Sequence, residues 1–245
     1  MNEPLPALPA PAPVSPRKAG PAGFTLIELL MVISIIAILA GMLVGLAPQA
    51  GARMKESRAR AELERLVTAI EAYKVKFGVY PPDTITGYQP QNGLPIVDPV
   101  INPLFYELSG LVVVNQGNSG YFVSLGDDDA ANKRLYPNQL TNFFGPTRDG
   151  FVNAATANEA RRLFRFPFKD SQHVEISRNP DIEVAVCPVP WPVGDARFPP
   201  PIPARPDANP WRYNSSNPLR NPGHFDLWCE IVVRGQKRII GNWKN

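Results

Sequence analysis

Hydrophobic residues form one continuous run near the start of the chain and recur periodically in the segment that follows. The apolar run from Leu29 to Leu46, extended back to Phe24, is close to the ~20 residues that a membrane-spanning helix needs. From Ala52 onward, apolar residues recur at steps of three and four, the spacing of one helix face. The pattern predicts one long helix, hydrophobic all round over 24–47 and amphipathic over 48–78. The apolar positions of its second half are Leu63, Leu66, Val67, Ile70, Tyr73 and Phe77.

Proline and glycine residues predict where this helix is disturbed and where it ends. Pro48 lies between the two halves, so we expect a kink or a locally melted turn over 45–51. The helix should end at Gly78, because the following Tyr80-Pro81-Pro82 cannot continue it. Two pairs on the solvent side have the spacing of intrahelical ion pairs. They are Glu56 with Arg60 and Glu71 with Lys74.

The rest of the chain, 79–245, alternates short apolar segments with turn residues and predicts a globular α+β domain. The segments with strand-like composition would form a small antiparallel sheet that covers the apolar face of the amphipathic helix. Short helices are expected at Leu104–Leu108 and Glu159–Phe164, strands at Leu111–Val114, Tyr121–Leu125, Val174–Ile176 and Ile182–Val186, and a closing hairpin of Phe225–Val233 and Lys237–Ile240 about Arg234-Gly235.

Glu28 is the one charged residue of the apolar run. An ionised side chain inside a bilayer costs about 2.5–3.5 kcal/mol on insertion scales, so such a residue usually has a partner and a function. Gly23, just before Phe24, is small enough to precede a peptidase cut. The cut would leave the new α-amine of Phe24 four residues before Glu28, on the same helix face. An ordinary secretory signal is cut after its apolar core, whereas this site precedes the core.

The words GFTLIELLMVISIIAILAGML resemble the N-terminus of prepilins and pseudopilins, the subunits of type IV pili and of type II secretion systems. They contain the small residue before the cut, the aromatic residue after it, the glutamate fifth in the mature chain and the apolar helix. The resemblance implies that a prepilin peptidase removes a leader, 1–23, methylates the amine of Phe24, and that Glu28 guides assembly. The alternative is an ordinary signal anchor in which Glu28 is incidental.

The flanking charges favour one orientation of this anchor. Arg17 and Lys18 precede it and, by the positive-inside rule, place the leader in the cytoplasm and the globular domain in the periplasm. Four cations after the apolar run, Arg53, Lys55, Arg58 and Arg60, weaken that bias. The resemblance implies residence in the inner membrane and then in a fibre. It also implies the partners: copies of the same chain, the peptidase, minor pseudopilins, and an inner-membrane assembly platform with a cytoplasmic ATPase.

Composition and motifs argue against several other classes. The net charge of +3 is too mild, and its cations are not interleaved with aromatic residues, so nucleic acid is not expected as the main partner. His173 and His224 are the only histidines, and no H-E-x-x-H, G-x-S-x-G or phosphate-cradling loop occurs. We therefore expect no enzyme and no cofactor.

A metal site is not expected either. Asp127, Asp128 and Asp129 are adjacent, but the EF-hand pattern needs alternate acids, a glycine and a distal glutamate, so a solvated turn is favoured. The C-terminal words NPWRY, GHFDLW and GNW resemble the closing strands of the major pseudopilin of type II secretion. In that family an Asp- and Gly-rich calcium loop precedes the last word, whereas this chain reads CEIVVRGQKRII. With no carboxylate after Glu230, the calcium site is not transferred.

Cys187 and Cys229 are the only cysteines. In an oxidising compartment they form a candidate disulfide, and closing a loop of roughly forty residues would contribute about 3–4 kcal/mol before strain. Two separately buried thiols are the equal alternative. Between them the excursion 187–210 is rich in proline, which makes up 29 of the 245 residues. It predicts either a stiff surface covering or a binding patch, with Trp191, Phe198 and Trp211 as its aromatic contacts.

The sequence therefore predicts a structural subunit of a type II secretion pseudopilus, processed by prepilin peptidase and assembled through its N-terminal helix. Two alternatives stay open. One is a type IV pilin or minor tip pilin for adhesion or DNA uptake, and the other is a membrane-anchored binding protein that does not polymerise.

Overall fold

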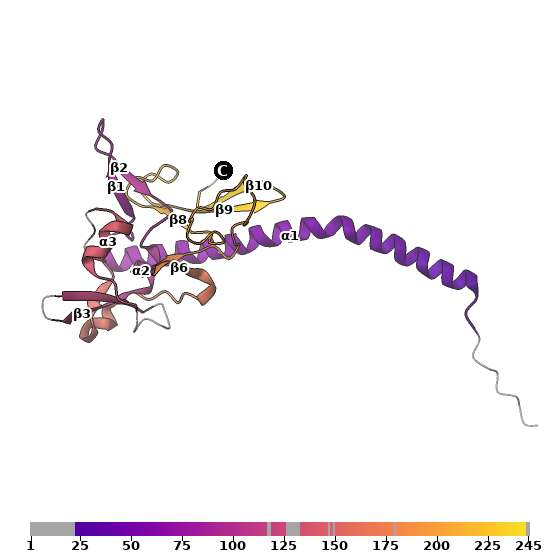
Figure 1. Cartoon of the computed structure of the whole chain (residues 1–245), viewed down its shortest axis with the longest axis horizontal. Helices are drawn as coiled ribbons and strands as arrows, with labels where there is room; N and C mark the ends of the chain where they lie inside the picture. The colour runs from indigo at the N-terminus through magenta and orange to yellow at the C-terminus, as the bar shows by residue number, and fades with distance from the viewer. Residues whose placement is uncertain are drawn as a thin grey trace, which may run out of the picture. The chain divides into compact units, whose positions relative to one another are not determined.

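The structure is a computed structural model that describes residues 23–116, 119–125, 133–146, 148, 150–178 and 180–243. Within the helix, only the backbone is described for 43–50. The chain divides into two compact units, 1–48 and 49–245, which are described separately below (Figure 1). The predicted leader, apart from Gly23, lies outside the described residues.

Helix α1 (Leu26–Phe77) contributes to both units and contains 52 residues. Its backbone stays helical through Pro48, so a locally melted turn over 45–51 is wrong, while a kink there stays a prediction. Alanines on both sides of Pro48 are strong helix formers and favour this continuity. The helix ends where predicted: Gly78 has a φ of +79°, and its N–H donates to the carbonyl of Lys74 at 2.8 Å.

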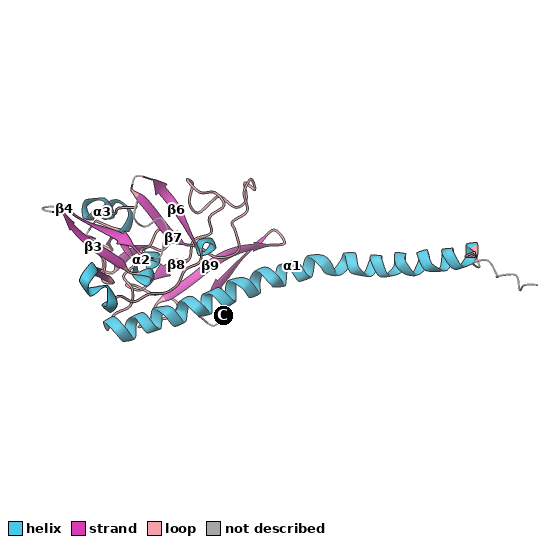
Figure 2. Ribbon diagram, turned by 90° about the horizontal axis from the view of Figure 1, so that it is seen from below, coloured by secondary structure: helices cyan, strands magenta, loops and turns pink. Residues whose placement is uncertain are grey.

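The second half of α1 buries one face against the rest of its own unit, 49–245, which is called the globular unit below. Its periodicity predicts this burial. Leu66, Ile70 and Tyr73 are fully buried, and Leu63 is nearly so. Ala59 extends the same row by one turn toward the N-terminus. Val67 and Phe77 lie at the border of the face and are partly buried against the core. Figure 2 shows this part of the helix running along one side of the unit, beside β8 and β9.

Strands and short helices make up the remainder of the globular unit, so the predicted α+β class is confirmed. The strands form two three-stranded sheets and two hairpins, and β3 pairs in parallel with β5, so that sheet is mixed. The sheet orders are β10-β9-β8, β4-β3-β5, β1-β2 and β6-β7. The elements are β1 (Thr84–Tyr88), β2 (Pro95–Asp98), α2 (Leu104–Ser109), β3 (Leu111–Gln116), β4 (Ser119–Ser124), α3 (Pro137–Phe144), β5 (Ala154–Thr156), η1 (Ala157–Arg162), η2 (Asp170–Gln172), β6 (His173–Arg178), β7 (Asp181–Ala185), β8 (Arg212–Asn214), β9 (Asp226–Val233) and β10 (Gln236–Gly241).

The closing hairpin follows the prediction most closely. Arg234 and Gly235 connect β9 to β10 with φ values of 53° and 70°. Both positive angles belong to a two-residue turn whose twist matches that of the strands, and glycine adopts such an angle without strain. Along β9, buried and half-buried residues alternate, as expected of a strand with one face on the core.

The predicted helical ion pairs are wrong in both cases. Glu56 bonds to Arg238 of β10 instead of Arg60, so its partner comes from the sheet rather than from the helix. Glu71 accepts a hydrogen bond of 3.3 Å from the hydroxyl of Tyr80 instead of pairing with Lys74. Tertiary partners replace the local ones because the helix packs against these elements along its length.

Candidate functional site

The N-terminal part of α1 begins with a reciprocal pair between Thr25 and Glu28. The carboxylate oxygen Oε2 of Glu28 accepts hydrogen bonds of 2.8 Å from both the backbone N–H and the hydroxyl of Thr25. In return, the backbone N–H of Glu28 donates to the Thr25 hydroxyl at 3.3 Å. The first helical N–H groups have no intrahelical partner, and this arrangement satisfies two donors at the helix start.

This geometry changes the role expected of Glu28. The helix begins at Leu26, so Gly23 and Phe24 precede it and the Phe24 backbone does not share a helix face with Glu28. In the structure the carboxylate accepts its hydrogen bonds from Thr25, a residue that was not predicted to take part. The spacing Thr-x-x-Glu was a signal for it, since this is the sequence pattern of a capping box.

The bond predicted to be cut lies in an open segment. Gly23 is exposed, a Cβ added to it would meet no atom of another part of the chain within 4 Å, and Phe24 is 84 % exposed. The side chains of 26–42 are also exposed, among them a dense set of large apolar residues. Among the described residues, no helix is both long enough and apolar enough to count as a candidate membrane span.

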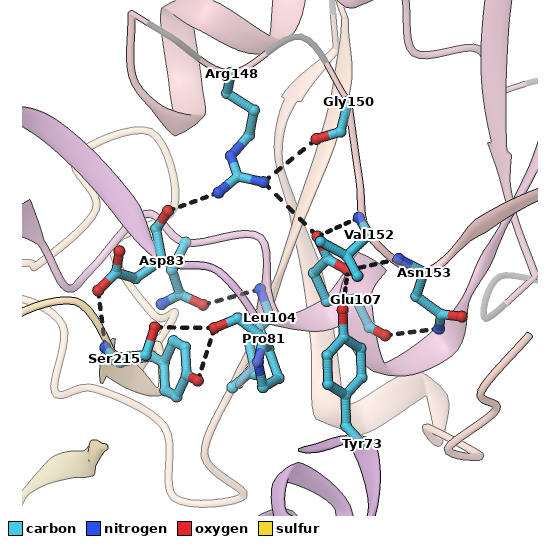
Figure 3. A network of polar contacts seen from close by, with 12 residues as sticks. Tyr73, Pro81, Asp83, Leu104, Glu107, Arg148, Gly150, Val152, Asn153 and Ser215 are labelled. Carbon is cyan, nitrogen blue, oxygen red and sulfur yellow. Dashed lines mark hydrogen bonds and ion pairs between the residues drawn. The ribbon is translucent and has the colours of Figure 1, made fainter. Parts of the chain in front are cut away.

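In the globular unit, a buried carboxylate connects α1 to two other segments (Figure 3). Glu107 of α2 is fully buried and accepts a hydrogen bond of 2.8 Å from the hydroxyl of Tyr73 on α1. The backbone N–H groups of Val152 and Asn153 donate to the same carboxylate at 3.2 and 3.0 Å, and Arg148 lies 3.7 Å away. Burial raises the pKa of Glu107 above its ordinary value, and the hydrogen bonds from Asn153 and Tyr73 oppose that rise.

A second buried acid fixes the chain just after α1. Asp83 is 2 % exposed, and its carboxylate accepts the backbone N–H groups of Ser215 and Ser216, each at 2.8 Å. The Ser216 hydroxyl donates to it at 2.6 Å. Arg148, the neighbour of Glu107, donates to the Asp83 carbonyl at 2.8 Å. Tyr73 and Asp83 therefore connect the end of α1 to α2, to the residues Arg148, Val152 and Asn153, and to the segment after β8.

The two cysteines lie together, and neither is disulfide-bonded in this structure. Cys187 is 4 % exposed and Cys229 fully buried. A hydrogen bond with Cys187, together with burial, raises the pKa of the Cys229 thiol. Asn209 organises this region, because its side-chain amide donates to the carbonyls of Val189 and Glu230 at 2.8 and 2.7 Å. The two thiols are therefore buried but adjacent, which neither alternative from the sequence described.

The remaining candidates for metal binding take other roles or lie outside the described residues. Asp127, Asp128 and Asp129 fall outside them, and within the described part no group of three or more His, Cys, Asp or Glu side chains could hold a metal ion. His173 contacts the carboxylate of Glu183 at 3.2 Å, and His224 contacts the hydroxyl of Tyr80 at 3.1 Å.

The C-terminal words resembling the pseudopilin family pack against one another. Asp226 accepts three backbone N–H groups of the preceding loop, from Leu219, Arg220 and Asn221, at 2.7–2.9 Å. The Asn242 side chain donates to the carbonyl of Phe225 and accepts the Leu227 N–H, each at 3.0 Å. Backbone donors occupy the Asp226 carboxylate, and the stretch CEIVVRGQKRII forms the β9–β10 hairpin.

The proline-rich excursion is held down by buried side chains. Trp191 is 5 % exposed and donates from Nε1 to the Phe198 carbonyl at 3.1 Å, while Ile202 and Trp211 are buried in the core. Its outer side contains an apolar hollow of about 420 Å³ lined by residues that include Val193 and Phe198. These contacts favour the covering interpretation, and they leave a small apolar surface on the outside.

Comparison with known proteins gives one match. Residues 19–44 match the family model described as the prokaryotic N-terminal methylation motif. No curated protein and no solved structure matches the chain. The match includes Gly23, Phe24, Thr25 and Glu28, so it supports a prepilin-type N-terminus of the kind found in type IV pilin-like proteins.

Proposed function

We propose that this chain is a prepilin-type subunit that is cut between Gly23 and Phe24, methylated on Phe24 and assembled into a helical fibre. The observation that carries the proposal is the methylation-motif match over 19–44, which contains both residues of the cut and Glu28. The exposed, non-helical position of Gly23 and Phe24 supports it, because a peptidase needs access to the bond that it cuts.

Assembly in this proposal uses the first half of α1. Its side chains over 26–42 are exposed and mostly apolar, so copies gain free energy by burying them against one another or against lipid. Glu28 then has two successive partners. In the free subunit it caps its own helix through Thr25, and in the fibre it meets the positive amine of Phe24 from a neighbouring copy.

We propose a structural rather than a catalytic role for the globular unit. In a fibre built from helices, a mechanical force on the fibre reaches the globular unit through the end of α1. The bonds of Tyr73 to Glu107, and of Asp83 to Ser215 and Ser216, would carry that force into the unit. The work of extraction from the membrane would come from a cytoplasmic ATPase of the assembly platform.

As the finer assignment we propose the pseudopilus of a type II secretion system. The order of the words NPWRY, GHFDLW and GNW at the C-terminus favours it over a surface pilus. A type IV pilin or minor tip pilin is the second candidate, and a membrane-anchored binding protein that does not polymerise is the third. The retained Glu28 disfavours a tip subunit, because loss of the glutamate at this position is the hallmark of such subunits.

The experiment is to express the full chain with a prepilin peptidase and to measure the mass of its mature N-terminus. The expected mature chain begins at Phe24 and is one methyl group heavier than its sequence. Gly23→Leu is the matched variant, since a pocket for a small residue should reject a branched side chain, and the chain should then stay uncut in the membrane. A mature terminus at Met1, or beyond Ala47, would refute the proposal.

Imaging of cells that overproduce the chain tests the second half of the proposal. Fibres that contain the chain are expected when the assembly platform is present. A secretion defect upon deletion would assign them to type II secretion, whereas loss of surface adhesion or DNA uptake would assign them to a pilus. A processed chain that forms no fibre in either system would favour the solitary binding protein.

A further inference from the structure

Exposed cations gather at the end of the globular unit that follows the apolar part of α1. On the helix they are Arg53, Lys55, Arg58 and Arg60, all of which are exposed. Within the described residues none of these four forms an ion pair. They therefore present charge to the surroundings rather than to the protein.

The β9–β10 hairpin adds three more cations beside them. Arg234 lies in the turn, and Lys237 and Arg238 begin β10, all exposed. The bond from Arg238 to Glu56 places β10 against the same stretch of α1. Figures 1 and 2 agree with this arrangement, since in both views the tip of the hairpin lies over the helix at this end of the unit. These seven cations are called the basic end below.

Few acids offset the basic end. Glu56 pairs with Arg238, Glu230 pairs with Lys237 at 3.2 Å, and Glu64 lies exposed on α1. Seven cations against three carboxylates leave an excess of four positive charges. The whole chain has a net charge of only +3, so its positive charge is concentrated here.

The position of the basic end along the chain indicates what it faces. Arg53 follows the apolar run that ends at Leu46 by only seven residues. A subunit held by that run would carry the basic end next to the lipid headgroups on the side of its globular unit. Cations at such a place oppose the usual cytoplasmic-positive bias, and anionic headgroups are the surface that would favour them.

We propose that the basic end is a docking surface for anionic phospholipid headgroups, which holds the unassembled subunit against the membrane. The proposal rests on the membrane residence of the subunit in the proposed function. Each Lys or Arg near an anionic leaflet strengthens the binding of the protein to that leaflet by about five-fold. Salt screens this electrostatic attraction over about 8 Å at physiological ionic strength. The contact is therefore strong enough to orient the unit and weak enough to be broken when the subunit is extracted.

The experiment uses the full chain reconstituted into vesicles of two compositions. One contains only phosphatidylcholine, and the other contains phosphatidylcholine with phosphatidylglycerol. Amide hydrogen exchange is measured over 53–60 and 234–238. Exchange over 234–238 should be slower in the anionic vesicles, and high salt should abolish the difference.

Two variants that remove the same number of charges separate the basic end from net charge. The first combines Arg53→Gln, Arg58→Gln, Arg60→Gln and Arg234→Gln, which breaks no ion pair described in the structure. The matched control combines Arg134→Gln, Arg161→Gln, Arg162→Gln and Arg165→Gln, four exposed positions outside α1 and the hairpin, and the ion pair it removes is the exposed one of Arg162 with Glu159. In the first variant, amide exchange over 234–238 should no longer be slower in the anionic vesicles. In the control it should still be slower.

Equal exchange in the two kinds of vesicle would overturn the proposal, as would equal loss in the two variants. Slowing that appears only in assembled fibres, without lipid, would also overturn it and would assign the basic end to a second copy. Fibre yield and N-terminal processing are measured separately, in cells that express the same chains with a prepilin peptidase and the assembly platform. Fibres without lipid-dependent slowing would refute this inference alone, whereas slowing without processing would refute the proposed function alone.

Discussion

The hydroxyl of Tyr73 donates a hydrogen bond of 2.8 Å to the carboxylate of Glu107, 34 residues away in the sequence. Both side chains are fully buried. The bond joins the last turns of α1 to α2, so it is a direct link between the helix that would build a fibre and the unit that the fibre would carry.

Tyr73→Phe should destabilise the globular unit by about 1–3 kcal/mol, the cost of leaving a buried acceptor with one donor fewer. The ring and its contact with Phe77 stay, so the loss reports the hydroxyl. Urea unfolding of the full chain in detergent measures it. Tyr88→Phe, at an exposed position of β1, is the control and should change the unfolding midpoint little.

Glu107→Gln should alter how stability depends on pH. Burial raises the pKa of Glu107 above its ordinary value of 4.5, so the native state holds the proton more tightly than the unfolded state. The stability that this tighter proton binding contributes is therefore fully present below about pH 4.5, and it is lost as the pH rises through the raised pKa. The unfolding free energy of the wild type minus that of the variant should decrease over this window. A difference that rises with pH would show that the three hydrogen bonds and the nearby Arg148 outweigh burial.

Asp83→Asn should cost about 2–3 kcal/mol, since the buried carboxylate accepts three hydrogen bonds that a neutral amide cannot all replace. The segment of 215–216 should then exchange its amide protons faster than in the wild type. Asp207→Asn removes an equal charge from an exposed side chain and should leave both quantities unchanged. Equal effects of the two substitutions would argue that charge alone, rather than the Asp83 contacts, is responsible.

Glu28→Ala should be cut after Gly23 and remain in the membrane, but enter fibres poorly, and Glu28→Asp should be intermediate. Thr25→Val separates the two roles of the carboxylate. It removes the hydroxyl that bonds to Glu28, at a cost of about 1 kcal/mol in helix capping, yet keeps the charge. Sheared-fibre yield should fall for Glu28→Ala and stay near wild type for Thr25→Val. Equal losses would reduce Glu28 to a capping residue.

The burial and the redox state of the two cysteines can be tested by mass spectrometry. Cys187 and Cys229 are buried free thiols, so iodoacetamide should modify neither in the native chain and both after unfolding, without any reductant. No modification in the unfolded chain would show that the two thiols, which already lie in contact, become a disulfide in the cell.

Local signals predicted the parts of the fold that depend on neighbouring residues. The face of α1, its end at Gly78 and the turn at Arg234-Gly235 each follow from spacing or from the conformational freedom of glycine. The hairpin of β1 and β2, the helix α3, the strand β8 and the parallel pairing of β3 with β5 were not predicted. Leu111 pairs with Ala154 across 43 residues, and no pattern within either strand encodes that choice.

In the candidate functional site, too, only the residues that form a local motif could be predicted from the sequence. Gly23, Phe24 and Glu28 form a local motif, and the capping pattern could also have revealed Thr25. Glu107 and Asp83 carry no such signal, because a charged residue is usually exposed and only the folded chain shows the donors that bury these two. The thiol contact is likewise a product of the fold, since Cys187 and Cys229 lie on separate elements.

β10 is the outer strand of its sheet, and within the described part of the chain no other strand pairs with its outer row of backbone groups. Such an edge is a template on which identical chains can stack into amyloid-like aggregates. Lys237 and Arg238 stand at its start, and a second copy adding its own β10 would bring like charges together. The edge therefore resists growth by strand addition, which would leave the helix contacts of the proposed fibre as the route by which copies associate.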